Sequence, residues 1–527
     1  MKPNKNIILA IIILSFVPVV ITLPLFLTGK LIFSQDIHWH FVWAEQFQSA
    51  LMEGVLYPRW MDTPFGYGSP TFIFYAPLSF YVISLINILT NSTILSINIA
   101  IYITFLLSGL SMYFFARNLN GERAGLISGV LYQLMPYHLF DLFARGVLPE
   151  LFAFIWFPLI LLFIRDIFTE RKFFSIAFVS LAYAGLILTH LVSAFMFTFV
   201  VIGYGLYSSL FEKKRGLLRM LCAAVLGLCL SSIYLTPVIF ERSFSHTELI
   251  KIFDYRNLFL FSYKNLMNRE FYPIVHGIAV SEIAFLLLSI LLARRKLIRV
   301  NNTFFIALAS ISLFLATPLS LLVWRYIPEF SNLQFPWRWL TFSGLSVAVI
   351  AGNLIGNFTG ELRKSLSLFF SPLLIISLFM MLHLSFFKEG EIDQWRTHPG
   401  LFSPFEYRPV WLTDPGKILH PVEKVIIRKG NGSVDIVDWK SNQRVSSTKG
   451  NTPLTLKFST FYYPGWKAKI DGNQNDIIIE KDTGSMLVEV PEGDHKVELT
   501  FEDTPVRYYA KVISLISLVI VTFILFI

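Results

Sequence analysis

Long runs of apolar residues dominate this sequence and restrict it to folds in which helices cross a lipid bilayer. A helix of ~20 apolar residues spans the hydrocarbon core, and twelve such runs can be placed along the chain. They cover residues 7–27, 93–116, 124–140, 150–168, 173–189, 191–211, 217–239, 277–293, 303–320, 339–358, 366–386 and 507–527. Since 54% of the 527 residues are hydrophobic and only 15% are charged, we expect an α-helical polytopic membrane protein with about 12 spans.

A further apolar run, residues 71–90, is long enough to cross and would reverse the side of every later loop. If it does not cross, seventeen Lys and Arg residues fall in short loops on the side of the amino terminus, against ten in the longer opposite loops. Cytoplasmic loops carry the excess of basic residues. We therefore predict a multi-pass protein of the cell (plasma) membrane with a cytoplasmic amino terminus, in which 71–90 is an outer-leaflet or re-entrant helix. The first run lacks a cleavage site and is expected to remain as a span.

The composition changes after residue 386, where polar residues, turn signals and alternating strand patterns replace the apolar runs. Leu454, Leu456 and Phe458 alternate with polar residues, as strands with one buried face do. The turn at 430–432 lies between two short apolar segments and predicts a hairpin. These patterns divide the chain into a membrane module over 1–386 with a first external loop at 28–92, an extracytoplasmic β-sandwich domain over 387–506, and a last transmembrane helix at 507–527.

Several function classes find no support in the residues. The net charge of +9 comes from the short basic loops between spans, so no nucleic-acid partner is expected. Glycine-rich phosphate loops and the HExxH zinc motif are missing from the sequence. The only two cysteines, Cys222 and Cys229, lie in one apolar run and form neither a disulfide framework nor a zinc site.

Asp36 follows the first span by a few residues and precedes a segment that can form a helix on the membrane surface. A carboxylate at that depth stays ionised while it faces a substrate carried by a lipid. Transfer of a sugar from a polyprenyl phosphate needs one carboxylate to accept the proton of the acceptor hydroxyl, because the phosphate leaves without a general acid. The alternative is structural, since Asp is a favourable residue at the start of a helix. We predict that Asp36 is the catalytic base.

Other polar residues lie at the predicted external ends of spans. Arg145 and Arg338 can each grip phosphate oxygens or anchor a helix at the interface. Asp141 and Glu150 flank Arg145 and form either an acceptor contact or an ordinary salt-bridged loop. His190 separates two spans with almost no loop between them, which favours a functional role. Three reserve cations, Arg242, Arg256 and Arg269, lie in the next external segment.

His38 and His40 are close enough in sequence to Asp36 to suggest a metal site. Residues two apart point to different faces of a helix, so the two rings are better explained as aromatic groups at the interface. We expect no cofactor, and the sequence gives no support for a divalent metal.

A set of short motifs gives the chain a family resemblance. These motifs are Ser34-Gln35-Asp36-Ile37-x-x-His40, Tyr57-Pro58-Arg59-Trp60, Gly66-x-Gly68-x-Pro70, Phe74-Tyr75-x-Pro77-Leu78, Arg145-Gly146-x-x-Pro149-Glu150, Thr189-His190 and Phe335-Pro336-x-Arg338. They resemble the prokaryotic membrane proteins labelled 6-pyruvoyl-tetrahydropterin-synthase-related, a family similar to GT-C-fold glycosyltransferases, with no pterin chemistry implied. The external block, through Tyr462-Tyr463-Pro464-Gly465-Trp466, resembles the terminal domain of YfhO-like proteins.

The resemblance implies a GT-C-like glycosyltransferase that moves a sugar from a polyprenyl-phosphate donor to an extracytoplasmic lipid or polysaccharide acceptor. GT-C enzymes carry an essential acidic residue in the first external loop, and Asp36 matches that position, with Asp62 as a reserve. In this interpretation Arg145, Arg338 and His190 bind the donor phosphate. Asp141, Glu150, His40 and Arg59 contact the acceptor or support the site. The alternative function is a non-catalytic transporter or assembly factor for cell-surface polysaccharide.

Overall fold

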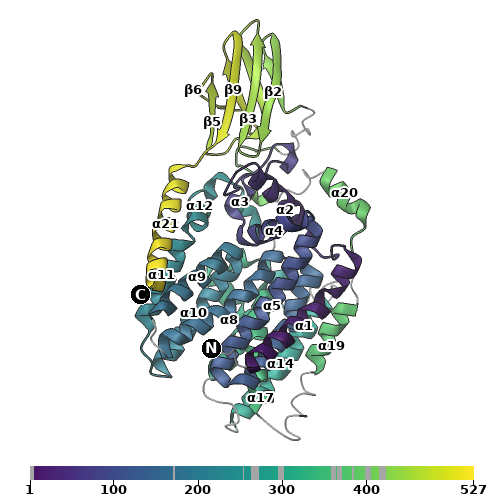
Figure 1. Cartoon of the computed structure of the whole chain (residues 1–527), viewed down its shortest axis with the longest axis vertical. Coiled ribbons are helices and arrows are strands. Elements are labelled where there is room, and N and C mark those ends of the chain that lie inside the picture. Colours follow the sequence, from purple (N-terminus) through teal and green to yellow (C-terminus); the bar gives the residue numbers. More distant parts are fainter. Residues whose placement is uncertain are drawn as a thin grey trace.

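The computed structural model is a helical module with a β-domain at one end (Figure 1). It describes residues 5–169, 173–252, 254–262, 272–294, 302–357, 364, 371–382, 385–397, 405–414 and 423–526. Figure 1 shows the strands stacked above the helices, with the last helix, α21, along the flank of the module. Helices and sheets together confirm the predicted class, a polytopic helical membrane protein with a carboxyl-terminal β-domain before a last apolar helix.

Seven helices among the described residues are long and apolar enough to cross a membrane. They are α1 (Lys5–Thr28), α5 (Thr93–Asn120), α8 (Leu148–Thr169), α10 (Leu191–Leu210), α14 (Tyr272–Arg294), α17 (Leu340–Asn357, whose span starts at Pro336) and α21 (Pro505–Phe526). The remaining predicted runs contain shorter helices: α6 (Glu122–Gln133), α9 (Phe174–Thr189), α11 (Leu217–Leu230) with α12 (Ser232–Phe240), α15 (Thr303–Leu315) with α16 (Leu321–Tyr326), and α19 (Ser371–Leu382). Each predicted run therefore contains a helix, and the number of spans by length lies between seven and nine.

Two helix pairs are sharply bent. The α11–α12 pair bends by 74°, and the break between α15 and the segment Pro318–Tyr326 is 87°. Pro318 explains the second break, because proline lacks the amide hydrogen that continues a helix and disfavours helical geometry in the residue before it. After each bend the chain enters short 3₁₀ turns.

The apolar run 71–90 forms two helices, α3 (Thr71–Phe74) and α4 (Leu78–Thr90). The break contains Pro77, and Tyr75 there has extended geometry. With 13 residues, α4 is about 20 Å long, which is shorter than the ~30 Å hydrocarbon core. The helix packs on α2 (Ile37–Met52) and α5. Its length agrees with the predicted non-spanning helix.

The β-domain contains two antiparallel sheets. One has the order β1 (Val425–Lys429), β4 (Leu454–Phe461), β8 (Ser485–Val490) and β7 (Ile478–Ile479). The other has the order β2 (Gly432–Lys440), β3 (Gln443–Gly450), β9 (Gly493–Phe501), β5 (Trp466–Ile470) and β6 (Asn473–Asn475). Apolar side chains from both sheets share one core, as in a sandwich.

The hairpin predicted at 430–432 is wrong. Strand β1 pairs with β4 and strand β2 pairs with β3, so the turn passes the chain from one sheet to the other. Gly430 has a φ of +98°, which gives the sharp change of direction. The turn is held by Asn431, whose carbonyl oxygen accepts from the Asn451 amide at 2.8 Å and whose amide donates to Thr452 at 2.9 Å. The local sequence determines that a turn forms at Gly430. The pairing of β1 with the distant strand β4 determines that this turn leads into the other sheet.

The β-domain is anchored to the segment between α1 and α5, which the sequence predicts to be the first external loop. Trp60, Tyr67 and Phe74 of the loop belong to the same apolar core as the two sheets. A second anchor joins Arg444 of β3 to Asp62, and the Arg444 side chain is fully buried. Residues 60–74 are thus packed against the β-domain.

A buried ion pair ties α21 to the end of α12. Arg507 donates to Glu241 through Nε at 3.1 Å and through Nη2 at 2.8 Å. Thr504 donates to the same carboxylate at 2.7 Å. A buried carboxylate with several charge-assisted hydrogen bonds fixes geometry strongly, so the last helix is locked against the membrane module at the base of the β-domain.

Candidate active site

Asp36 immediately precedes α2, but it does not cap the helix with its side chain. Its backbone amide donates to the carbonyl oxygen of Arg145 at 2.8 Å, and the amide of Gln35 donates to Ala144 at 3.0 Å. Among the described residues, no hydrogen bond to the Asp36 carboxylate is seen. The structural alternative, a helix cap, therefore has no side-chain bond to support it.

Gly146 makes this close approach of the two segments possible. Its φ of +67° is in the left-handed region, where residues with a Cβ are strained. A Cβ on Gly146 would also lie 2.1 Å from the hydroxyl of Ser34 and 3.0 Å from the amide of Ile37. The Arg145-Gly146 motif is thus explained by packing against the residues on both sides of Asp36.

Beside Asp36, Glu150 joins two arginines from distant parts of the chain. Its Oε2 accepts from Arg145 at 2.7 Å and from Arg338 at 3.2 Å. Tyr137 donates to Oε1 at 3.2 Å, and Arg145 also lies 3.4 Å from Asp141. Glu150 and Arg145 are each only 2% exposed. We call Asp36, Asp141, Arg145, Glu150 and Arg338 the polar cluster.

Local backbone irregularity positions the polar cluster. Asp141–Arg145 form one π-helical turn, and α8 begins at Leu148, so Glu150 lies in the first turn of a long helix. Single π turns of this kind are frequent at functional sites. Asp141, Arg145 and Glu150 were predicted to lie in one loop. That prediction is wrong, since the π turn contains the first two, α8 contains Glu150, and only two residues separate these elements.

Phe335 lies between the two arginines. The guanidinium carbon of Arg145 is 5.4 Å from the ring centroid, and that of Arg338 is 5.1 Å away. Arg338 also donates to the carbonyl oxygen of Leu333 at 2.7 Å. Cation–π contacts and a backbone acceptor hold both guanidinium groups in fixed orientations.

Burial raises the pKa of both aspartates, and the neighbouring charges act differently on the two. Burial raises the pKa of Asp36 above its ordinary value, and the nearby Arg145 and Arg338 partly offset that rise. For Asp141, burial and the Glu150 carboxylate raise the pKa well above its ordinary value. Asp36 is therefore a stronger base than an exposed aspartate, and Asp141 favours its protonated form.

His40 and His190 lie within electrostatic reach of the polar cluster. Burial lowers the pKa of each ring to about 3, so both are neutral near pH 7. His190 is also 2.7 Å from the hydroxyl of Ser193. Neutral imidazoles can donate or accept a hydrogen bond beside the cluster, but they add no positive charge to it.

A cavity of about 550 Å³ opens beside Asp36. It is lined by Phe33, Ser34, Gln35, His38, Phe143, Ala144, Phe387 and Trp395. Ser34 and Gln35 immediately precede Asp36, and Ala144 precedes Arg145. The cavity thus adjoins both Asp36 and Arg145 along the chain, has aromatic walls and is of the size that takes a small ligand.

Two residues named from the sequence lie elsewhere. Arg59 is 3.7 Å from Asp503 and has its guanidinium over the ring of Tyr57. Asp62 forms an ion pair with Arg444 of the β-domain. Both belong to the contacts that join the first loop to the carboxyl-terminal half, and the structure does not bring them into the polar cluster.

Three aromatic residues of the site were not singled out from the sequence. Tyr137 bonds to Glu150, Phe335 separates the arginines, and Tyr75 lies within electrostatic reach of Asp36, Arg338 and Glu150. Tyr75 and Phe335 occur in the motifs that carry the family resemblance, so that signal was available. Tyr137 lacks such a signal.

Among the described residues, no group of three His, Cys, Asp or Glu side chains is placed to hold a metal.

The fold and the cluster define an integral membrane protein with a buried ionic site and an aromatic cavity near it in sequence. Residues 72–388 match the family described as 6-pyruvoyl-tetrahydropterin synthase related domain, a family of membrane proteins. The chain belongs to this family, which confirms the resemblance found from its motifs. A comparison with curated proteins finds no match.

Solved structures with a similar chain course include an oligosaccharyltransferase and an arabinofuranosyltransferase. The apo oligosaccharyltransferase of Archaeoglobus fulgidus matches at TM-score 0.49 and 12% identity, over 77% of this chain and 61% of that one. The same enzyme, AglB, in complex with an inhibitory peptide and a dolichol-phosphate matches at 0.46 and 11%, over 76% and 60%. The mycobacterial arabinofuranosyltransferase AftD matches at 0.40 and 14%, over 77% and 28%. The chain thus spans about three fifths of the first of these structures.

Proposed function

We propose that this protein is an integral membrane glycosyltransferase that moves a sugar from a polyprenyl-phosphate donor to an extracytoplasmic lipid or glycan acceptor. The observation that carries the proposal is the position of Asp36. Its carboxylate does not cap its helix, its backbone is bonded to Arg145, and it lies within electrostatic reach of the buried Arg145–Glu150–Arg338 group. The two residues before it line an aromatic cavity. A base, fixed cations and a cavity at the membrane surface are the parts that this reaction needs.

In the proposed step, the acceptor hydroxyl oxygen attacks the anomeric carbon of the donor sugar. The new carbon–oxygen bond forms as the bond from that carbon to the phosphate oxygen breaks, with inversion of configuration. The hydroxyl proton passes to Asp36, and the polyprenyl phosphate leaves with the bonding electrons. No general acid is needed, because the departing phosphate is a stable anion at neutral pH. One carboxylate is sufficient, unlike the pair used in glycoside hydrolysis.

Charge balance in the polar cluster supports this assignment. With Asp141 protonated, two guanidinium groups face two ionised carboxylates, Glu150 and Asp36. When Asp36 accepts the proton, the cluster gains one net positive charge while the leaving phosphate gains one negative charge. In a site of low dielectric constant, such matched changes stabilise the transition state more than the ground state.

We propose that Arg338 and Arg145 contact the donor phosphate, with the neutral rings of His190 and His40 as hydrogen-bonding neighbours. Both guanidinium groups contact the ring of Phe335 and donate to the same oxygen of Glu150, and such a pair suits several phosphate oxygens at once. The aromatic cavity next to Asp36 is proposed to admit the acceptor.

The alternative is a transporter or assembly factor for polysaccharide, and the two bent helix pairs are the observation that favours it. Transporters place their substrate and ion sites at such breaks. The residues at these breaks, 229–233 and 315–318, include no ionisable side chain apart from the thiol of Cys229. The ionic groups lie instead around Asp36, which favours the enzyme.

The deciding experiment measures transfer of labelled sugar from polyprenyl-phosphate sugars in membranes that contain the wild type or Asp36→Asn. The amide keeps the size of the side chain but cannot accept the proton, so transfer should fall by about 10²–10⁴-fold at an unchanged protein level. Asp438→Asn, on the exposed strand β2, is the matched control and should keep full activity. Near-normal transfer by Asp36→Asn would remove Asp36 from the mechanism.

A further inference from the structure

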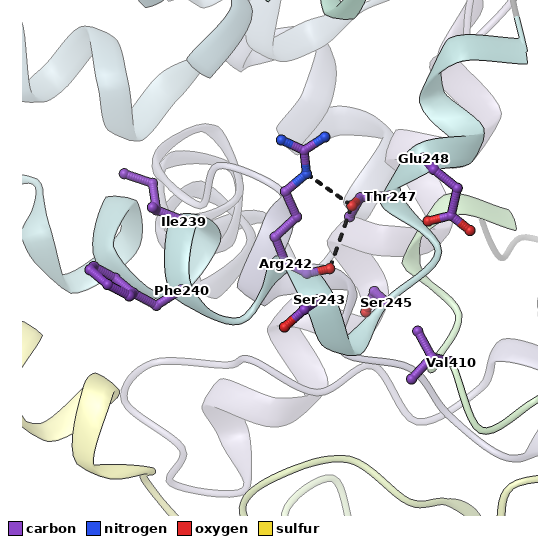
Figure 2. Close-up of a pocket in the computed structure, with 8 residues that line it drawn as sticks. All are labelled: Ile239, Phe240, Arg242, Ser243, Ser245, Thr247, Glu248 and Val410. Carbon is purple, nitrogen blue, oxygen red and sulfur yellow. Dashed lines mark hydrogen bonds between the residues drawn. The ribbon is translucent and has the colours of Figure 1, made fainter.

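A second pocket lies away from the polar cluster, where α12 ends below the β-domain (Figure 2). It has a volume of about 440 Å³. Its lining residues are Ile239, Phe240, Arg242, Ser243, Ser245, Thr247, Glu248 and Val410. We call it the Arg242 pocket.

The frame of the Arg242 pocket is fixed by backbone pairing between two distant segments. Ser245 forms a β-bridge with Pro409, and the amide of His246 donates to Arg408 at 3.0 Å. The amide of Val410 in turn donates to Phe244 at 3.1 Å. Both walls are therefore held in place, and the pocket is a feature of the fold rather than of one exposed side chain.

Arg242 is the cation of this pocket, and it has no ion pair among the residues that the structure describes. Its Nε donates to the hydroxyl of Thr247 at 3.2 Å, which fixes the direction of the guanidinium. Figure 2 shows the two terminal nitrogens turned away from that bond. Glu248 at the rim is an unfavourable neighbour for an anion, but its carboxylate lies 2.8 Å from the ring of His246.

Arg256, on the same external segment, is an arginine that does have an acidic partner. Its Nε donates to Asp254 at 2.8 Å in an exposed ion pair. Arg242 is exposed as well, but its terminal nitrogens have no acidic partner among the residues that the structure describes. A guanidinium group with free terminal donors at the edge of a pocket suits the oxygens of an anion. The free donors of Arg242 therefore indicate an anionic ligand.

Apolar side chains beside the Arg242 pocket indicate where that anion comes from. Ile239 is 58% exposed and Phe240 is 65% exposed, at the end of a helix that bends by 74° from α11. If α11 runs along the membrane normal, α12 lies close to the membrane plane, with these two side chains at the boundary between headgroups and chains. Exposed apolar groups next to a cation fit a lipid better than a free ion.

We propose that the Arg242 pocket binds the phosphate group of a membrane lipid. The terminal nitrogens of Arg242 hold the phosphate oxygens, Thr247 fixes the guanidinium group through its Nε, and Ile239 and Phe240 contact the lipid chains. This lipid site is separate from the polar cluster, and its occupation does not depend on the proposed transferase reaction.

Native mass spectrometry of the full-length protein with added phosphatidylglycerol tests the proposal. We expect a retained lipid on the wild type and a loss of affinity of about tenfold or more for Arg242→Gln, since a charge-assisted hydrogen bond is removed. Arg256→Gln removes the same charge from the same external segment and should retain the lipid. Equal retention by both variants, or equal loss, would overturn the proposal.

Two further arms separate a lipid from a free phosphate ion. Excess inorganic phosphate should leave the bound phosphatidylglycerol in place, because it lacks the chains that contact Ile239 and Phe240. Phe240→Ser should weaken lipid retention without altering the charge of the pocket. Complete displacement of the lipid by inorganic phosphate, or full retention by Phe240→Ser, would show that no lipid chain is recognised and would overturn the assignment.

Discussion

The backbone amide of Asp36 donates a hydrogen bond to the carbonyl oxygen of Arg145 at 2.8 Å. This bond joins the segment before α2 to the π turn that carries Asp141 and Arg145. Because Arg145 also binds Glu150, the candidate base is attached to the ion pairs through one short chain of bonds. A shift of either segment therefore alters the distance between the base and both guanidinium groups.

The raised pKa of Asp36 predicts the pH dependence of transfer. The base acts only when it is deprotonated, so the rate should fall as the pH drops through the pKa of Asp36. Burial raises that pKa above the ordinary 3.8, so the acid limb should have its midpoint above this value. A pH–rate profile of kcat/KM in membranes measures it. A midpoint at or below 3.8 would contradict the proposed environment of Asp36.

Gly146→Ala tests whether the close approach to the Asp36 segment matters for turnover. The new methyl group adds backbone strain of about 1–2 kcal/mol at positive φ and also collides with Ser34. Gly29 has nearly the same φ, +65°, and a methyl group added there would meet nothing within 4 Å, so Gly29→Ala carries the strain without the collision. We expect turnover to fall about tenfold or more for Gly146→Ala only, since small displacements of catalytic groups are costly.

Thermal unfolding of both glycine variants provides the control for stability. If Gly146→Ala and Gly29→Ala lose similar stability but differ in turnover, the loss of turnover in Gly146→Ala comes from a shift in the position of Asp36. Equal turnover in the two variants would show that the contact with Ser34 has no catalytic consequence.

The sequence predicted the helices and several strands because their signals are local. Apolar length marked the spans, and the alternation at Leu454, Leu456 and Phe458 marked β4. These three side chains are buried as expected, but the strand is buried on its other face as well, including Lys457. The pairing of strands depends on distant segments. This is why the predicted β1–β2 hairpin failed although the turn at Gly430 is present.

Ion pairs of the site could be predicted only in part. Arg59 and Arg145 both have aromatic and proline residues nearby in sequence, yet Arg59 approaches Asp503 while Arg145 binds Glu150. Glu150 and Arg338 are 188 residues apart, and only the packed helices bring them together. Local sequence indicated which residues were unusual for a membrane protein, and tertiary packing determined their partners.

The predicted topology can be tested with single cysteines in a background without Cys222 and Cys229. Arg123→Cys should react with a membrane-impermeant maleimide only from the cytoplasmic side, and Ser433→Cys only from outside. Both positions are exposed. Leu56→Cys and Asn91→Cys lie before and after the 71–90 segment and should both react from outside, because α4 is too short to cross. Labelling of these two from opposite sides would show that 71–90 spans the membrane.

Arg338→Lys and Arg145→Lys test the proposed phosphate contact while keeping the charge. Arg338 bonds to Glu150 and to the carbonyl oxygen of Leu333 at once, over the ring of Phe335. A lysine ammonium is a compact charge and cannot reproduce that planar arrangement. If the guanidinium groups hold the donor phosphate, the KM for the polyprenyl-phosphate sugar should rise about tenfold, with a smaller change for the acceptor.

Arg428→Lys, in an exposed pair with Glu480 on the β-domain, is the control and should change neither value. An equal rise of both KM values in Arg338→Lys and Arg145→Lys would indicate that these arginines support the structure of the site without contacting the donor.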